Sequence, residues 1–281
     1  MNNQRQQWID LAVPFFIFLV TGIVFLPVIN WLLGQTVAHE QLLHAFLVFL
    51  LSGALLVYER RISIRFVFQF SDTSQNLLIL SYAVLVLSIF TRINLIVLAS
   101  LSLAVSSLLL FVFGREQRRL IFSGIGAFTL FAAVAVLLPV MDWPLRTIAG
   151  KWAAYGLNLF GQNVELGLYR SPSGPMLMLF NNGQPFHVAA ECNGFGMVSS
   201  SLLMAAIIVL YRRMSLFDRS GWLLMALLIG LFFNAVRIMI IVLLAPMLPE
   251  GAYMFMHETV GLITTYGGLA ALYFLLMPRE K

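Results

Sequence analysis

The sequence predicts an all-α integral membrane protein with about eight transmembrane helices. Two observations predict this fold. Of the 281 residues, 60% are hydrophobic and 10% are charged, whereas a soluble domain carries roughly 25% charged residues. The apolar residues are also grouped in runs long enough to cross a bilayer. Because no soluble core could bury so much apolar surface, residues 1–281 are expected to form a single polytopic membrane domain.

Apolar runs define the expected helices. They cover residues 11–33, 42–57, 76–91, 93–113, 120–141, 193–211, 222–246 and 257–277. The first run is too long for the core of a signal peptide and lacks a clear small-residue cleavage site, so it is expected to remain as the first helix. The net charge of +5 is spread over short clusters between the runs. The basic residues do not form the single patch that would indicate a nucleic-acid partner.

The basic residues predict the orientation of the chain. Most of the 17 lysines and arginines fall on one side of the membrane if the N-terminus is cytoplasmic. They are Arg5, Arg60, Arg61, Arg65, Arg115, Arg118, Arg119, Arg212, Arg213, Arg219, Arg279 and Lys281. By the positive-inside rule, both termini are expected to be cytoplasmic. The expected location is the cell (inner) membrane, crossed many times.

One long connection, residues 142–191, is then expected on the extracytoplasmic side. Lys151–Gly161 has the composition of an interfacial helix. Short extended segments with a turn signal at Asn182-Gly183 follow: Val164–Tyr169, Met176–Phe180 and Phe186–Ala190. The loop is therefore expected to be a small α/β-ribbon that leads the chain to Cys192.

Arg237 is a charged residue inside the seventh apolar run. A charge at the centre of a membrane helix costs roughly 2.5 to 3.5 kcal/mol on insertion scales, so an intramembrane arginine indicates a functional site. Asn234 precedes it by three residues on the same helical face and can share a hydrogen-bond network with it. The alternative is a structural arginine that is satisfied by backbone carbonyls or extends to the membrane surface.

Cys192 is the only cysteine, so no internal disulfide can form. It stands at the predicted external end of the sixth helix, followed closely by Gly194 and Gly196, which let another backbone approach. Free amides in a first helical turn favour negative charge, which promotes the thiolate. The alternative is a small, inert packing residue.

His257 begins the eighth run, again at the predicted external face. An imidazole there can exchange protons with water. Its surroundings are no zinc-protease motif, because Gly261 stands where a second histidine would be needed. His39, His44 and His187 are expected at the membrane interfaces, and His187, which is close to Cys192 in the sequence, is also a rival base. No metal or organic cofactor is expected.

The three residues together indicate more than each one alone. The predicted topology brings Cys192, Arg237 and His257 to the outer half of three consecutive helices, within residues 192–261. A thiolate can attack a carbonyl, an imidazole can move the proton, and a guanidinium can stabilise the anionic intermediate. This combination is typical of thiol acyl transfer.

The same residues resemble the exosortase and archaeosortase family. Its members carry a Cys in a Glu-x-Cys-x-Gly-like motif, an Arg in an Asn-x-x-Arg motif, and a His, on three successive late helices. This chain reads Glu191-Cys192-Asn193-Gly194, then Asn234-Ala235-Val236-Arg237, then His257. The motif resemblance covers about residues 163–261. The sequence departs from the family pattern in two places. Asn193 stands where the family commonly has Ser, and this chain reads Ala-Glu-Cys where many members read Glu-Ala-Cys. The subfamily therefore stays open.

The resemblance implies a membrane cysteine protease of transpeptidase type. Its expected partners are exported proteins with a C-terminal short motif, hydrophobic helix and basic tail, and a lipid or glycan acceptor for the new carboxyl end. Cys192 is the expected nucleophile and His257 the general base and acid, while Arg237 stabilises either the oxyanion or the thiolate. Glu191 and Asn234 are expected to orient the cysteine segment and the guanidinium.

Two other functions stay open from the residues themselves. A transporter or flippase would use Arg237 to bind an anionic substrate, and Cys192 would be incidental. Against it, few other polar residues lie within the runs and no inverted repeat is visible. A non-catalytic envelope or polysaccharide assembly factor would instead bind its partners through residues 142–191.

Overall fold

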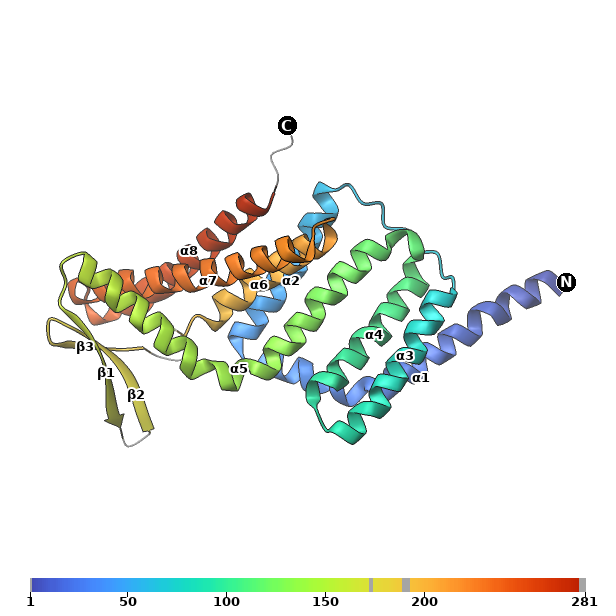
Figure 1. Ribbon diagram of the computed structural model, residues 1–281, viewed down its shortest axis with the longest axis horizontal. Coiled ribbons are helices and arrows are strands. Elements are labelled where there is room, and N and C mark those ends of the chain that lie inside the picture. Colours follow the sequence, from blue (N-terminus) through green and yellow to red (C-terminus); the bar gives the residue numbers. More distant parts are fainter. Residues whose placement is uncertain (1, 172–173, 189–192, 278–281) are drawn as a thin grey trace. The chain divides into compact units, whose positions relative to one another are not determined.

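The computed structural model describes residues 2–171, 174–188 and 193–277. Its helices are α1 (Asn2–Ala38), α2 (Glu40–Glu59), α3 (Asp72–Thr91), α4 (Asn94–Phe113), η1 (Arg115–Gln117), α5 (Arg118–Leu159), α6 (Phe195–Tyr211), α7 (Leu216–Leu244), η3 (Ala245–Met247) and α8 (Glu250–Leu276). Its strands are β1 (Val164–Ser171), β2 (Gly174–Asn181) and β3 (Gln184–His187) (Figure 1). The described chain is thus helical apart from one small sheet, which confirms the predicted all-α fold class.

Within the described ranges, seven helices are long and apolar enough to cross a membrane. Six of them, α1 to α5 and α7, cover predicted runs, and the seventh is the Phe255–Leu276 part of α8. α6 covers the remaining run and is apolar, but it has only 17 residues, somewhat short of the ~20 that a span usually needs. The protein is therefore a multi-pass membrane protein.

The chain divides into two compact units. Unit 1 comprises Met1–Val136 and Ala206–Met214, and unit 2 comprises Leu137–Ala205 and Ser215–Lys281. Helices α5 and α6 contribute to both units. Every described residue of the predicted site belongs to unit 2.

In unit 1, serine pairs join α3 to α4. The Ser74 hydroxyl donates to the Ser107 carbonyl at 2.8 Å, and the Ser107 hydroxyl donates back to the Ser74 carbonyl at 2.6 Å. Ser81 and Ser100 repeat this exchange at 2.8 and 2.7 Å. In lipid, where apolar side chains gain little by leaving the hydrocarbon, such hydrogen bonds and close packing hold helices together. They fix the α3–α4 hairpin.

Helix α5 continues past residue 141, where the sequence predicts its end. The run at 120–141 and the interfacial helix predicted at Lys151–Gly161 belong to one helix that reaches as far as Leu159. Pro144 lies inside it, and an ion pair between Asp142 and Arg146 bridges the same turn. Pairs four residues apart stabilise a helix, and α5 continues through the proline. Asp142, predicted as the first loop residue, therefore lies within α5.

The end of α5 leads into an antiparallel sheet with the strand order β1-β2-β3. The Asn158 side chain makes the connection: it accepts a hydrogen bond from the Val164 N–H at 2.8 Å and donates to the Val164 carbonyl at 2.9 Å. Asn182-Gly183 joins β2 to β3 with two positive φ angles, as in a type I′ hairpin turn. The predicted ribbon is confirmed; its expected last residue, Ala190, lies outside the described residues.

One face of the sheet packs on α5 and α7 within unit 2. The cluster contains Ala149, Ala153, Ala154 and Leu157 of α5, Val164, Leu177 and Leu179 of the sheet, Val188, and Ile238 and Val242 of α7. The Val188 N–H also donates to the Leu177 carbonyl at 2.9 Å. The sheet therefore carries the chain, as far as Val188, to the part of α7 that follows Arg237.

Candidate active site

Helices α7 and α8 carry the described residues of the predicted site. Asn234 and Arg237 lie in the second half of α7, and His257 lies two turns into α8. The two helices run beside each other (Figure 1). Cys192 and Glu191 lie outside the described residues. The structure bears on them only through their neighbours along the chain.

Asn234 is fully buried and lies against the start of α6. Gly194 has φ of +78°, and a Cβ atom built on it would come within 2.5 Å of the Asn234 amide nitrogen. Both facts require glycine there. One turn earlier on α7, a Cβ on Gly230 would lie 2.9 Å from the Val198 Cα. Small residues thus bring α6 and α7 into backbone contact, and Gly194, two residues after Cys192, lies against Asn234.

Arg237 packs against α8. A Cβ atom on Gly261 would lie 3.1 Å from a terminal guanidinium nitrogen and 3.2 Å from Cζ, so the guanidinium rests against bare backbone. Gly261 follows His257 by four residues, which places the two on the same helical face one turn apart. Arg237 and His257, predicted to act together, are therefore separated by about one turn of α8.

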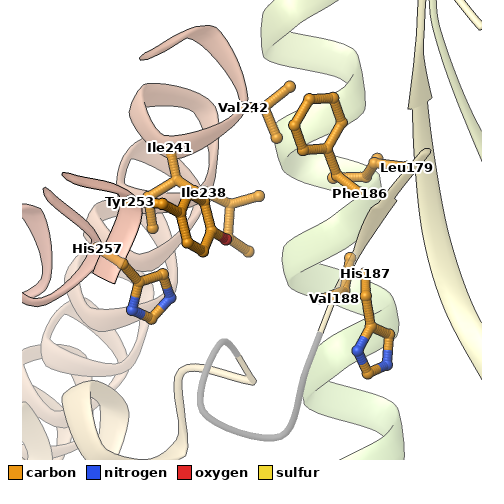
Figure 2. A pocket seen from close by; sticks show the side chains of 9 residues that line it. All are labelled: Leu179, Phe186, His187, Val188, Ile238, Ile241, Val242, Tyr253 and His257. Carbon is orange, nitrogen blue, oxygen red and sulfur yellow. The ribbon is translucent and has the colours of Figure 1, made fainter. Parts of the chain in front are cut away.

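His257 also lines a cavity of about 80 Å³ in unit 2 (Figure 2). Most of its wall is aliphatic or aromatic, including Val188, Ile238 and Tyr253. The Tyr253 ring lies 6.0 Å from the imidazole, centre to centre. The cavity therefore has room for water or one small group beside the imidazole.

The rival histidine reaches the same cavity from the other side. His187 ends β3 and is exposed, whereas His257 is partly buried. Figure 2 shows both imidazoles at this cavity, His257 on α8 and His187 on the ribbon. Because Arg237 packs one turn from His257, the geometry favours His257 as the residue that works with the guanidinium.

A polar network at the start of α6 was not predicted from the sequence. The Asn193 amide nitrogen donates to Asp142 Oδ1 at 2.6 Å, and its oxygen accepts from the Phe195 N–H at 2.8 Å. Arg146 Nε donates to the same Asp142 oxygen at 3.1 Å. An asparagine just before an apolar helix is a typical capping signal, but its partner 51 residues earlier carries no signal in the sequence.

These side chains define what the site can do. A guanidinium on α7 packs one turn from an imidazole on α8, and that imidazole lines a small cavity. Such a pair can stabilise an anion and move a proton. In the part of the chain that the structure describes, no three His, Asp or Glu side chains are grouped to hold a metal ion.

Comparison with known protein families identifies the family of this chain. The model of the transmembrane exosortase family (Exosortase_EpsH) matches residues 31–275, which is most of the chain. No curated protein and no solved structure matches this sequence.

Proposed function

Because the chain belongs to the transmembrane exosortase family, we propose that it cleaves a C-terminal sorting signal from exported proteins by thiol acyl transfer. Cys192 is the nucleophile, His257 the general base and acid, and Arg237 the cation at the reacting centre. The reaction takes place at the extracytoplasmic face of the inner membrane. The family implies a membrane sorting enzyme in general; the particular reaction and these roles are our proposal.

The contact between Arg237 and Gly261 carries the proposal, because it brings the guanidinium to the helix turn that follows His257. The chain on either side of Cys192 supports it too. Val188 packs in the cluster with Ile238, and Gly194 lies against Asn234, so both flanks meet α7 beside Arg237. Cys192 lies between those two anchors in the sequence.

In the first half-reaction, His257 takes the proton of the Cys192 thiol and the sulfur attacks the carbonyl carbon of the scissile peptide bond. The carbonyl oxygen becomes an oxyanion, which Arg237 stabilises by charge and hydrogen bonding. The intermediate collapses as the C–N bond breaks. The protonated His257 gives its proton to the leaving amine, which departs with the hydrophobic helix and basic tail.

The second half-reaction releases the remaining protein. The thioester on Cys192 is attacked by an acceptor amine or hydroxyl, or by water, whose proton passes to His257. The C–S bond breaks and the sulfur leaves as a thiol after taking that proton back. The outcome is transfer to an acceptor or hydrolysis, according to the nucleophile that enters.

A direct test uses a substrate that carries a candidate signal, incubated with membranes containing the wild-type protein, with and without hydroxylamine. Hydroxylamine attacks thioesters, so it should divert the product to a C-terminal hydroxamate of defined mass. Appearance of that mass supports an acyl-enzyme. Loss of the tail with no hydroxamate at any hydroxylamine concentration would contradict it, and an unchanged substrate over a panel of signals would favour a transporter.

The Arg237→Lys variant tests the shape of the cation. Arginine presents a planar fork of donors, whereas lysine is a compact point charge. If Arg237 makes directed hydrogen bonds to the oxyanion, the turnover rate should fall by about 10² to 10³-fold, the usual effect of removing one oxyanion donor. The measurement is kcat and KM for processing. Near-full activity in Arg237→Lys would show that Arg237 acts only as a point charge and makes no directed hydrogen bonds.

The Gly261→Ala variant moves the guanidinium without removing it. The added methyl would lie 3.1 Å from the terminal nitrogen of Arg237, so this flexible side chain has to shift by a few tenths of an ångström. We expect turnover to fall about tenfold, since misplacement by 1 Å can cost about 10²-fold, while thermal stability changes little.

A matched control lies on the same helix. A Cβ atom on Gly267 would meet Phe233 at 4.0 Å, an ordinary contact. Gly267→Ala therefore makes the same helix-favouring change without touching Arg237. Equal turnover in Gly261→Ala and Gly267→Ala would refute the inference that the position of Arg237 limits the reaction.

A further inference from the structure

Asn193 is held from two directions at the start of α6. Its side chain is 3% exposed, its oxygen accepts from the Phe195 N–H, and its nitrogen donates to Asp142 at 2.6 Å. The amide cannot be turned over, because its oxygen would then face a carboxylate and its nitrogen would face an N–H donor. The two hydrogen bonds fix the orientation of the Asn193 side chain.

Arg146 fixes the carboxylate in turn. It donates to both Asp142 oxygens, through Nε and a terminal nitrogen, in a two-point ion pair on α5. The Arg146 side chain is 17% exposed and that of Asp142 31% exposed, so water screens this pair only in part. A two-point pair sets the rotation of a carboxylate as well as its position, so Asp142 Oδ1 is aimed at Asn193.

The backbone conformation of Gly194, the residue after Asn193, gives the hydrogen bond between Asn193 and Asp142 its importance. Gly194 has a positive φ angle. Glycine adopts this backbone conformation without strain, and it changes readily to other backbone conformations. Asn193 lies before this point, and its hydrogen bond to Asp142 ties it to α5.

We propose that Asp142 and Asn193 act as a clamp that positions Cys192, with Arg146 holding the clamp in place. This proposal rests on the proposed function of Cys192. Cys192 precedes Asn193 directly in the sequence, and the Cα atoms of neighbouring residues are at most about 3.8 Å apart. Asp142 and Asn193 are therefore positioning residues: they act through the backbone of Cys192 and do not touch the substrate.

The clamp predicts a pattern among three variants. Asn193→Asp keeps the oxygen that caps α6 but puts a second carboxylate against Asp142, and kcat should fall by about 10²-fold with little change in KM. Asp142→Asn removes the charge and should lower kcat less. The double variant, Asp142→Asn with Asn193→Asp, exchanges the two groups and restores one donor and one acceptor, so it should recover much of the loss.

The control is Glu165→Gln, which neutralises an exposed carboxylate on β1 outside the network; its kcat should match that of the wild type. Rates are expressed per folded protein from size exclusion, so misfolding alone does not lower them. If the double variant is no better than Asn193→Asp, the clamp is wrong. If Asn193→Asp fails to accumulate, the decision falls to Asp142→Asn: an unchanged kcat there overturns the clamp.

A second readout needs no substrate. Cys192 is the only cysteine, so the rate of its alkylation by a small maleimide reports on this segment alone. Asn193→Asp should change that rate and the double variant should return it towards the wild-type value. If no sorting signal is ever processed, the proposed function is wrong. The alkylation rates of the variants still test the clamp in that case. Wild-type alkylation rates in every variant would overturn it.

Discussion

Replacing Cys192 with alanine is expected to lower processing of the sorting signal by at least about 10⁴-fold, as loss of a nucleophile does in other enzymes that use one. The chain has no other cysteine, so no second thiol can take over the attack. Arg237 and His257 would remain, yet neither can form the thioester. The measurement is the intact mass of a substrate after timed incubation with membranes that contain either form at equal abundance.

Two controls make this result specific. Insertion and abundance of Cys192→Ala should match the wild type, which a quantified membrane fraction verifies. Cys192→Ser keeps the size of the side chain but replaces the thiol by a hydroxyl, which is far harder to ionise, so it too should be nearly inactive. Tail removal at the wild-type rate by Cys192→Ala would refute thiol catalysis.

The same variant separates the competing functions. In a transporter or flippase, Arg237 binds the substrate and Cys192 is incidental, so flux should survive Cys192→Ala. In an assembly factor, changes on the ribbon, such as at Tyr169, should matter while Cys192, Arg237 and His257 tolerate replacement. The enzyme alone requires all three residues and leaves a substrate of changed mass.

Hydrophobic length was enough to predict most of the fold. Each predicted run matches a described helix, because a bilayer demands about 20 apolar residues in a row and offers few alternatives. The ribbon was readable too, since Asn182-Gly183 is a strong hairpin signal. The end of α5 was not readable. Pro144 and the charged Asp142 favour a loop locally, and Arg146, the ion-pair partner of Asp142, lies in a stretch already assigned to that loop.

The candidate site could be predicted from the sequence only where a polar or charged residue interrupts an apolar run. Asn234 and Arg237 are polar residues in an apolar run, and the described structure brings them to α6 and α8. The clamp between Asp142 and Asn193 was missed because it joins side chains 51 residues apart, each unremarkable in its own segment. Asn193 even counted as a departure from the family pattern. Its two hydrogen bonds give that departure a physical role.

The His257→Ala variant should lower kcat by about 10² to 10⁴-fold, the usual contribution of a general acid and base. His187→Ala is the matched control, because both imidazoles line the same cavity and each replacement removes the same group. We expect His187→Ala to lose less than about tenfold, since His187 is exposed and lies on the ribbon while Arg237 packs one turn from His257.

Added imidazole makes the comparison sharper. In His257→Ala the cavity of about 80 Å³ gains the space of the missing ring, so free imidazole can enter and act as base. Activity should then rise with imidazole concentration in His257→Ala and stay flat in His187→Ala. If His187→Ala proves the more damaged variant, or the one that imidazole restores, the general base is His187. The catalytic pair would then join the ribbon to α7, and α8 would serve only to support Arg237 through Gly261.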